Sequence, residues 1–554
     1  MLITVFPAGI VFLYIIAGRK SMSLLTIEDA LMCGLMLVTV YAQFFSLFAK
    51  VSLAAHIILY LIDLALFIFI LKNAELKAFL LSLSSPLRNK AFLKICLIIF
   101  SILLFSYGTS RGYMHYDSDL YHAQSIRWIE ECGVVKGLGN LHGRLAYNSS
   151  SFVLSAMYSF AFLSPTSLHA CAGFMALTVF LCSLRFIHIF SDKKPSVTDF
   201  VRLAAMYYIF NIFDEMVSPA SDYFAMLLFL YIVLRLCDLY KAYDADLWAV
   251  FTFLSVFLAT IKFSAAGVLL ICLLPIFSLI REKKVLRILE YSGIGIIIAL
   301  PYFIRNYLIS GWLLYPSTII DIFSPEWKIP KFYADVDSSY IIAFGRGFSN
   351  MDASNYSLVE WFPHWFSTLG DTEKIFMLGS FASIPVFLCL FFLDRKKNPL
   401  YLTELSVILT FLMWLLSSPL IRYGQGIILC LPFMMFGHLF IFISCRLSGK
   451  LSISKWLNYL AVLFFALFVL YKGIAILSYC YKRSYEPYYL RQLDYGKYEL
   501  QTYSVKGVTF YAPLYGDQVG YAPFPSSPQV NNIFTLLGDD IKDGFKSTHF
   551  PETY

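Results

Sequence analysis

The sequence predicts an all-α membrane protein that crosses the bilayer many times, and three observations support this fold class. Hydrophobic residues make up 59% of the 554 residues and charged residues only 14%, against about 25% charged residues in an average soluble domain. Apolar runs of about 20 residues, the length that crosses a hydrocarbon core as a helix, recur along the chain. Lys and Arg, which give the net charge of +7, cluster in short loops, where they indicate membrane topology and give no reason to expect nucleic-acid binding.

We predict about fourteen spans from these runs. One further apolar piece, residues 150–163, is short for a span, so we predict a re-entrant or interfacial helix there. With this assignment the Lys and Arg clusters of the short loops all lie on the cytoplasmic side, and the large polar regions share the opposite side. The predicted spans lie near residues 2–17, 25–48, 51–72, 91–107, 167–190, 199–216, 222–240, 247–261, 264–280, 287–308, 373–394, 400–419, 423–446 and 456–479.

We predict five regions along the chain. They are 1–90 (N-terminal transmembrane helices), 91–308 (transmembrane core with the polar segment 107–148), 309–372 (aromatic-rich loop), 373–480 (C-terminal transmembrane helices) and 481–554 (tail). The tail is polar and rich in Tyr, and its stretch V-K-G-V-T-F-Y-A-P predicts a β-strand within a small α+β extension.

The eleven cysteines contain no CxxC pair and lie mostly in or beside apolar runs, so they predict neither a disulfide framework nor a zinc site.

One polar segment, residues 107–148, interrupts the apolar sequence, and we call it the polar island. Ionisable residues beside a bilayer are costly unless they have partners or a function, so we place the candidate chemistry here. Asp117 or Ser118 is a suitable N-cap for a helix that runs to about Glu131 and ends at Gly133. The polar island brings together His115, Asp117, Asp119, His122, Arg127, His142 and Arg144.

The two aspartates of the polar island point in different directions on such a helix. Asp117 shares a face with Tyr121, whereas Asp119 points nearly the other way. The two carboxylates would bind one ion only if the segment before Leu120 were extended. We expect one of them to cap the helix, and the simplest alternative is that both only cap and solvate the helix end.

Three later motifs place polar residues at the ends of predicted spans. S-P-A-S-D ends at Asp222, where a span begins. P-Y-F-I-R-N contains Arg305 and leads out of another span, and S-P-L-I-R-Y contains Arg422 and Tyr423 at the outer end of a third. Each motif by itself is common, so their order along the chain carries the information.

The first large loop contains an Asp four residues before a Tyr, and the three motifs follow it in this order. Together they resemble the sequence pattern of the GT-C superfamily. Its members are integral membrane glycosyltransferases that use polyprenyl-phosphate sugars. The resemblance covers residues 107–424. Members commonly carry an adjacent acidic pair; here Ser118 follows Asp117 and the second acid is Asp119, so either aspartate is a candidate base. H-Y-D-S-D-L-Y-H-A-Q and L-G-N-L-H-G-R are also similar to bacterial membrane proteins associated with surface polysaccharide.

The resemblance implies an enzyme, its partners and its location. It implies an inverting glycosyltransferase that moves a hexosyl or pentosyl group from a polyprenyl-phosphate donor to a glycan or lipid acceptor. It implies a GT-C-like helix bundle in the bacterial inner membrane, with the active site and the C-terminus on the periplasmic side. A divalent metal ion, Mg²⁺ or Mn²⁺, is left open, with His115, Asp117 and Asp119 as candidate ligands, because their spacing matches no strong metal-site pattern.

Displacement of a polyprenyl phosphate from a sugar needs a base for the acceptor hydroxyl and a cation for the phosphate. We predict Asp117 as the base, with Asp119 as a second carboxylate, a metal ligand or the base in its place. Arg422 is the first candidate for a phosphate clamp, with Tyr423 beside it, and Arg305 is the second; the alternative is that either arginine only marks a helix end. The hypothesis requires a carboxylate just outside the bilayer to lie close to one of these guanidinium groups.

Other residues are candidates for substrate contacts, each with a structural alternative. Asp222 and Lys262 would equally well form an ion pair in the bundle, and His142 would equally well be an ordinary loop residue. Trp361 and Trp365 belong to a loop that holds four of the eight tryptophans, which would bind a sugar or line the membrane interface. The candidates are Tyr121, His122, His142, Arg144, Asp222, Lys262, Trp361 and Trp365.

Two other function classes are open from the sequence. A transporter of lipid-linked glycans would place its charges in mid-span and show duplicated halves, whereas the charges here gather at one face. A surface-polysaccharide polymerase or ligase would depend on the loop 309–372 more than on the polar island. Separate loss of Asp117 and Asp119 distinguishes these classes, because a polymerase should tolerate the loss of either carboxylate.

Overall fold

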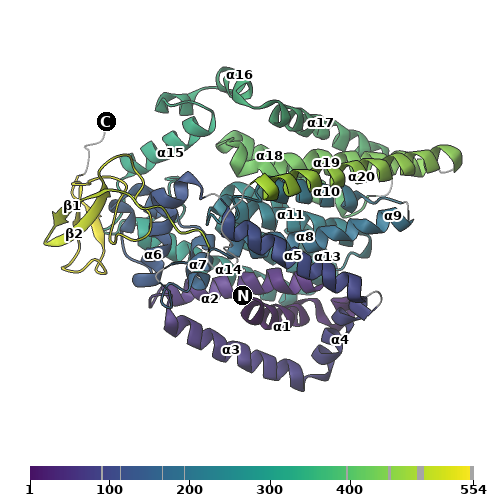
Figure 1. Cartoon of the computed structure of the whole chain (residues 1–554), viewed down its shortest axis with the longest axis horizontal. Helices are drawn as coiled ribbons and strands as arrows, with labels where there is room; N and C mark the ends of the chain where they lie inside the picture. The colour runs from purple at the N-terminus through teal and green to yellow at the C-terminus, as the bar shows by residue number, and fades with distance from the viewer. Residues whose placement is uncertain are drawn as a thin grey trace.

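The computed structural model describes residues 1–88, 91–112, 114–164, 166–192, 194–394, 397–446, 451–482 and 492–549. Most of these residues are helical, as the sequence predicts, and the long helices lie side by side in one bundle (Figure 1). The α-helices are α1 (Leu2–Ser21), α2 (Ile27–Ser46), α3 (Leu53–Lys72), α4 (Ala74–Arg88), α5 (Ala91–Arg111), α6 (Ala123–Glu131), α7 (Ser150–Ser159), α8 (Cys171–Ser183), α9 (His188–Asp192), α10 (Val197–Asn211), α11 (Ser221–Leu239), α12 (Ala245–Ile261), α13 (Leu273–Arg281), α14 (Val285–Ser310), α15 (Lys331–Gly345), α16 (Leu358–Thr368), α17 (Asp371–Leu393), α18 (Leu400–Ser417), α19 (Ile421–Arg446) and α20 (Leu451–Lys482).

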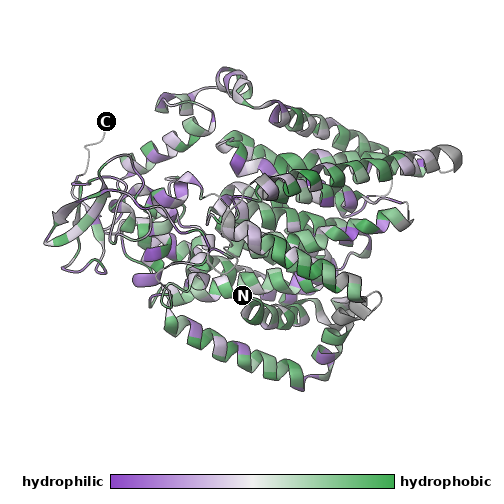
Figure 2. Cartoon of the chain, in the orientation of Figure 1, coloured by the Kyte–Doolittle hydropathy of each residue, from purple (hydrophilic) through white to green (hydrophobic). Residues whose placement is uncertain are grey.

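Within the described residues, nine helical segments are long and apolar enough to cross a membrane, so the chain is a multi-pass membrane protein. Figure 2 shows the apolar residues along the bundle and the polar residues gathered at one end. The predicted span 199–216 is the shorter helix α10, and α7, with 10 residues, is too short to cross by itself. The nine segments are Ile27–Ser46, Leu53–Lys72, Cys171–Phe190, Ser221–Ala242, Phe263–Arg281, Val285–Ser310, Asp371–Leu393, Leu400–Ser417 and Ile421–Arg446, and four shorter apolar helices are Leu2–Gly18, Ile95–Ser110, Ala245–Ile261 and Val462–Ser478.

The tail forms strands and no helix in its described residues, 492–549. β1 (Leu500–Val505) pairs antiparallel with β2 (Val508–Pro513), and β3 (Phe534–Leu536) pairs antiparallel with β4 (Phe545–Ser547). The strand predicted in V-K-G-V-T-F-Y-A-P is therefore confirmed as β2, whereas the expected α+β extension contains only strands in this range. The two tight-turn residues between β1 and β2 both take positive φ, as a two-residue hairpin turn requires.

A second apolar core, separate from that of the bundle, holds the polar end of the molecule together. Trp128 of the polar island is fully buried against Phe524 and Phe545 of the tail, with ring centroids 4.7 and 5.7 Å apart. Trp312 and Ile329 of the long loop belong to the same cluster. Figure 1 shows α6, α15 and the strands together at this end. We call the polar island, residues 309–345 and residues 492–549 the cap.

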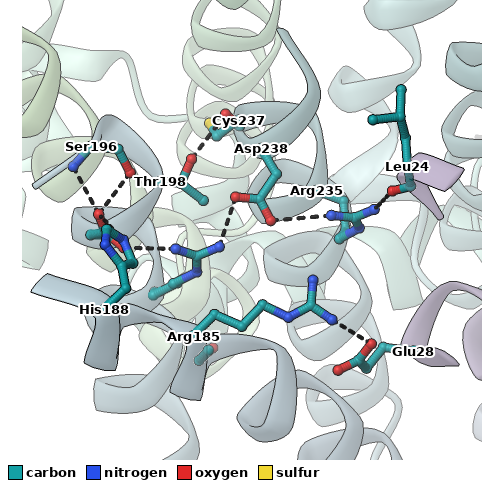
Figure 3. A network of polar contacts seen from close by, with 12 residues as sticks. Leu24, Glu28, Arg185, His188, Ser196, Thr198, Arg235, Cys237 and Asp238 are labelled. Carbon is teal, nitrogen blue, oxygen red and sulfur yellow. Dashed lines mark hydrogen bonds and ion pairs between the residues drawn. The ribbon is translucent and has the colours of Figure 1, made fainter. Parts of the chain in front are cut away.

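A network of buried ion pairs lies at the end of α2 that is remote from the cap (Figure 3). Arg235 pairs with Asp29 at 2.8 Å and with Asp238 at 3.1 Å. Arg202 pairs with Asp238 at 2.7 Å and with Asp199 at 2.6 Å. Each charge has a partner of opposite sign, as buried charges require, so the network fastens α2, α10 and α11 to one another. Asp199 and Arg202, the two charged α10 residues in this network, are buried at 0% and 5% exposed.

Candidate functional site

The polar island meets the bundle at an ion pair between Asp117 and Arg422. Asp117 lies just before a π-helical turn, Ser118–His122, and Arg422 lies in the first turn of α19. Nη2 of Arg422 is 2.7 Å from Oδ2 of Asp117, and its Nε is 2.9 Å from Oδ2 of Asp222, in the first turn of α11. The guanidinium is thus shared between a carboxylate of the cap and a carboxylate of the bundle.

Two further cations border this pair. Lys262, which follows α12, pairs with Asp222 and places its Nζ 3.3 Å from the centre of the Tyr423 ring. Nη1 of Arg144 lies 3.8 Å from Oδ1 of Asp117. With three cations and two carboxylates, the cluster carries a net positive charge, which favours an anionic ligand. We call Asp117, Asp222, Arg422, Lys262 and Arg144 the charged centre.

The charges set the protonation states in the polar island. Burial alone would raise the pKa of Asp117, but the charge and hydrogen bond of Arg422, with smaller contributions from His122 and His115, together outweigh burial and hold this pKa below its ordinary value of 3.8. Burial, followed by the charge of Arg422, lowers the pKa of His115, so His115 is neutral at pH 7 and its ring contacts the guanidinium. At neutral pH Asp117 is therefore an ionised carboxylate whose basicity is suppressed by its partner.

Asp119 faces away from the charged centre and toward the tail. Its Oδ1 accepts a hydrogen bond from the backbone N–H of Gly496 and its Oδ2 accepts one from the hydroxyl of Tyr498, both at 2.9 Å. Burial raises the pKa of Asp119, and these two hydrogen bonds oppose the rise. Asp117 stands at the N-cap position, as expected, but its side chain makes no capping hydrogen bond, and the side chain of Asp119 bonds to the tail. Of the candidate metal ligands, His115 and Asp117 lie 3.6 Å apart but Asp119 faces the tail, and the described residues contain no cluster of three or more His, Cys, Asp or Glu that is arranged for a metal ion.

The tail covers the outer face of α6 through polar contacts. The side-chain amide of Gln124 donates to the carbonyl oxygens of Gly520 and Pro523 at 2.9 Å. Arg127 donates to the carbonyl oxygen of Tyr521 and lies over the Tyr521 ring. Glu130 is 6% exposed and accepts a hydrogen bond from the Tyr521 hydroxyl. The tail thus fixes the helix that follows Asp117.

Replacing Glu130 by Gln should remove a pH dependence of stability. Burial raises the pKa of Glu130 from 4.5 to about 7, so between these pH values the folded protein keeps a proton that the unfolded chain loses. The free energy of unfolding therefore falls as pH rises through this window, by about 3 kcal/mol in total. Measured as unfolding temperature from pH 4.5 to 8, Glu130→Gln should gain stability relative to the wild type as pH rises. Glu131→Gln, at the exposed neighbour, should follow the wild-type profile; parallel profiles for all three proteins would contradict the assignment.

Three other predicted site residues border the charged centre. Tyr121 lies under the guanidinium carbon of Arg144, at 6.0 Å from the ring centre. His122 is buried against Phe152, and burial lowers its pKa to about 3. Nδ1 of His142 accepts a hydrogen bond from the backbone N–H of Arg144, and burial lowers the pKa of His142 to about 4. Both histidines are therefore neutral at pH 7, and His142 helps to hold the turn that carries Arg144.

Three predicted residues have structural surroundings away from the charged centre. The side chain of Arg305 donates to Asn148 and Ser46. Trp365 donates from Nε1 to the carbonyl oxygen of Pro419 at 2.9 Å. Trp361 and Trp365 are each 2% exposed, so they pack between helices and present no free ring face to a sugar.

Asp337 in α15 joins the polar island to the long loop, and no sequence motif singles it out. Its carboxylate accepts hydrogen bonds from the hydroxyls of Tyr147, at 2.8 Å, and Tyr315, at 3.0 Å. Burial raises the pKa of Asp337, and the two tyrosines oppose the rise. Tyr147 in turn packs edge-on against Tyr121, with ring centroids 5.7 Å apart. The acidic group of α15 is thus connected to the border of the charged centre.

The fold and the charged centre define a multi-pass membrane protein with a polar site where its cap meets its helix bundle. Residues 1–429 match a family described as a domain of unknown function (DUF8201), and the chain belongs to this family. The match contains the whole charged centre and ends before α20 and the tail. No curated protein and no solved structure matches the chain. The resemblance to the GT-C superfamily therefore rests on the motifs of the sequence.

Proposed function

We propose that this protein is an inverting glycosyltransferase of the GT-C type, which moves a sugar from a polyprenyl-phosphate donor to a glycan or lipid acceptor. In this proposal the chain crosses the bacterial inner membrane about fourteen times, and the cap faces the periplasm. The observation that carries the proposal is the 2.7 Å contact between Asp117 and Arg422. The reaction needs a base and an anion-binding cation side by side, and this pair supplies both where the cap meets the bundle.

The donor phosphate is assigned to the bundle side of the charged centre. Arg422 presents a fixed fork of N–H groups that suits phosphate oxygens, and Lys262 adds a second cation to the same cluster through Asp222. Both cations lie at helix ends, next to membrane-spanning segments. A lipid phosphate therefore reaches them while its chain stays in the hydrocarbon region.

The proposed reaction forms one bond and breaks another. The acceptor oxygen bonds to the anomeric carbon on the face opposite the phosphate, the bond from that carbon to the phosphate oxygen breaks, and its electron pair stays on the phosphate. Asp117 takes the proton of the acceptor hydroxyl. Arg422 stabilises the charge that develops on the leaving phosphate.

Donor binding also strengthens the base in this scheme. A phosphate that binds Arg422 competes with Asp117 for the same guanidinium. Because burial by itself raises the pKa of Asp117, a carboxylate released from Arg422 accepts a proton more readily. The base is then active when the donor is in place, which limits wasteful reactions of the free enzyme.

The test uses the full-length protein in lipid nanodiscs. Bare polyprenyl phosphate should raise the unfolding temperature of the wild type in a saturable way, because the lipid phosphate binds Arg422. A panel of polyprenyl-phosphate sugars, supplied with envelope glycolipids as acceptors, should release polyprenyl phosphate. Absence of both effects would contradict the proposal, and donor release that survives loss of Asp117 would favour a polymerase.

A further inference from the structure

Arg305 is a buried cation without an anionic partner among the described residues. It lies in α14, near the end of the bundle that carries the cap, and is 2% exposed. Its Nε donates to Oδ1 of Asn148 at 3.1 Å, and its Nη1 donates to Oγ of Ser46 at 2.5 Å. Both partners are neutral. Hydrogen bonds to neutral groups satisfy N–H donors but do not cancel a charge, and a buried charge without an opposite charge is costly.

A small cavity beside Arg305 gathers further hydrogen-bond donors. Its volume is about 20 Å³, which is room for a single water-sized particle. Ser125 and Trp128 of α6 line the cavity, and both are buried, at 7% and 0% exposed. Within the described structure, neither the Ser125 hydroxyl nor the Trp128 indole N–H has a hydrogen-bond partner. Of the described residues that line this cavity, none is Asp or Glu.

We propose that this cavity binds one monatomic anion of the halide class, chloride in a cell, held by Arg305 with Ser125 and Trp128. Three features of the site converge on this ligand class. The lining supplies a guanidinium, a hydroxyl and an indole N–H, all of which donate. An anion cancels the charge of Arg305, whereas a water molecule does not. The volume admits one atom of this size and excludes a phosphate group, so the site is distinct from the proposed donor site at Arg422.

The anion site lies between α6 of the polar island and α14 of the bundle. Ser125 of α6 and Arg305 of α14 line the cavity, and Ser46, at the end of α2, accepts a hydrogen bond from Arg305. A bound anion therefore fastens the polar island to the bundle. Because the ligand binds the folded protein, it raises stability by mass action. The inference is independent of the proposed glycosyltransferase activity.

A chloride titration of the purified full-length protein tests the site. The protein is transferred to gluconate buffer and chloride is added at constant ionic strength. The unfolding temperature should rise with chloride and level off, and bromide should replace chloride. A wild-type protein whose unfolding temperature does not change between gluconate and chloride would overturn the proposal.

Variants decide whether the effect arises at this cavity. Arg305→Gln should abolish the dependence on chloride, and Ser125→Ala should raise the half-saturating concentration by roughly tenfold, because it removes one hydrogen bond to a charged ligand. Arg346→Gln is the matched control, since Arg346 is also buried and also donates to neutral groups, the carbonyl oxygens of Ala353 and Ser354, but does not line this cavity. It should keep the wild-type response. If Arg305→Gln does not fold, the Ser125→Ala titration decides, and an unchanged half-saturation there would also overturn the proposal.

Discussion

Replacing Asp117 by Asn is expected to lower the rate of sugar transfer by about 10²–10⁴-fold, the usual contribution of a general base. Asn keeps the size of the side chain and can still accept a hydrogen bond from Arg422, but it cannot take a proton from an acceptor hydroxyl. Affinity for bare polyprenyl phosphate should be unchanged or higher, because the lipid no longer competes with a carboxylate for Arg422. Initial rates of polyprenyl-phosphate release, with donor binding measured separately, check both expectations.

The pH dependence of the wild-type rate gives a second readout of the same base. In the free enzyme Arg422 holds the pKa of Asp117 below 3.8, so kcat/KM should stay constant down to about pH 4. In the donor complex the phosphate occupies Arg422 and the pKa of Asp117 rises, so kcat should begin to fall at a higher pH. In Asp117→Asn, neither kcat nor kcat/KM should fall at low pH, because the group whose protonation causes the fall (the acid limb of each pH profile) is gone.

Asp119→Asn is the matched control for Asp117→Asn. It changes a carboxylate two residues away, and its contacts are to Gly496 and Tyr498 of the tail. We expect lower stability and a moderate loss of rate from the displaced loop, with the acid limb of kcat preserved. Asp117→Asn activity above a tenth of the wild type, or a larger loss in Asp119→Asn, would show that Asp117 is not the base.

Much of the helical architecture follows from the sequence, because the hydrocarbon thickness sets the length of an apolar run. The predicted spans 51–72, 373–394 and 423–446 correspond to helices Leu53–Lys72, Asp371–Leu393 and Ile421–Arg446. α10 departs from this pattern because its helix ends at Asn211, after 15 residues, although the predicted span continues to residue 216. The number of spans and their orientation stay predictions.

The sequence identified all five residues of the charged centre but not the partners of every polar-island residue. Asp117, Asp222 and Arg422 stand out because carboxylates and guanidinium groups at span ends are costly without partners. The tail contacts of Asp119 join residues more than 370 positions apart, and no local pattern encodes such pairs. Asp337 lies in a polar, aromatic loop where an acidic residue looks ordinary. From its sequence motif, Arg305 was a plausible phosphate-binding residue, second to Arg422. The structure distinguishes the two, because the partners of Arg305 are neutral whereas Arg422 pairs with carboxylates.

Replacing Arg422 by Gln is expected to abolish binding of polyprenyl phosphate and to lower the free energy of unfolding by about 3 kcal/mol. The two effects have different causes. The guanidinium is the proposed donor ligand, and it also neutralises Asp117 and Asp222, which are 17% and 5% exposed. Removing one partner of a buried ion pair leaves an uncompensated charge, which is strongly destabilising. Binding is measured by the stabilisation that bare polyprenyl phosphate produces in nanodiscs, and stability by thermal unfolding without the lipid.

A second substitution separates the two effects. In Arg422→Gln with Asp117→Asn, the carboxylate that loses its guanidinium partner is removed as well, while Asp222 keeps Lys262 as its partner, so part of the stability should return. Binding of polyprenyl phosphate should not return, because Asn and Gln supply no cation. Arg144→Gln is the control for cation loss as such, since Arg144 lies 3.8 Å from Asp117 and its side chain is 42% exposed; we expect it to weaken lipid binding only slightly. If the double variant binds polyprenyl phosphate like the wild type, Arg422 is a structural arginine, and the phosphate must be sought elsewhere on the cap.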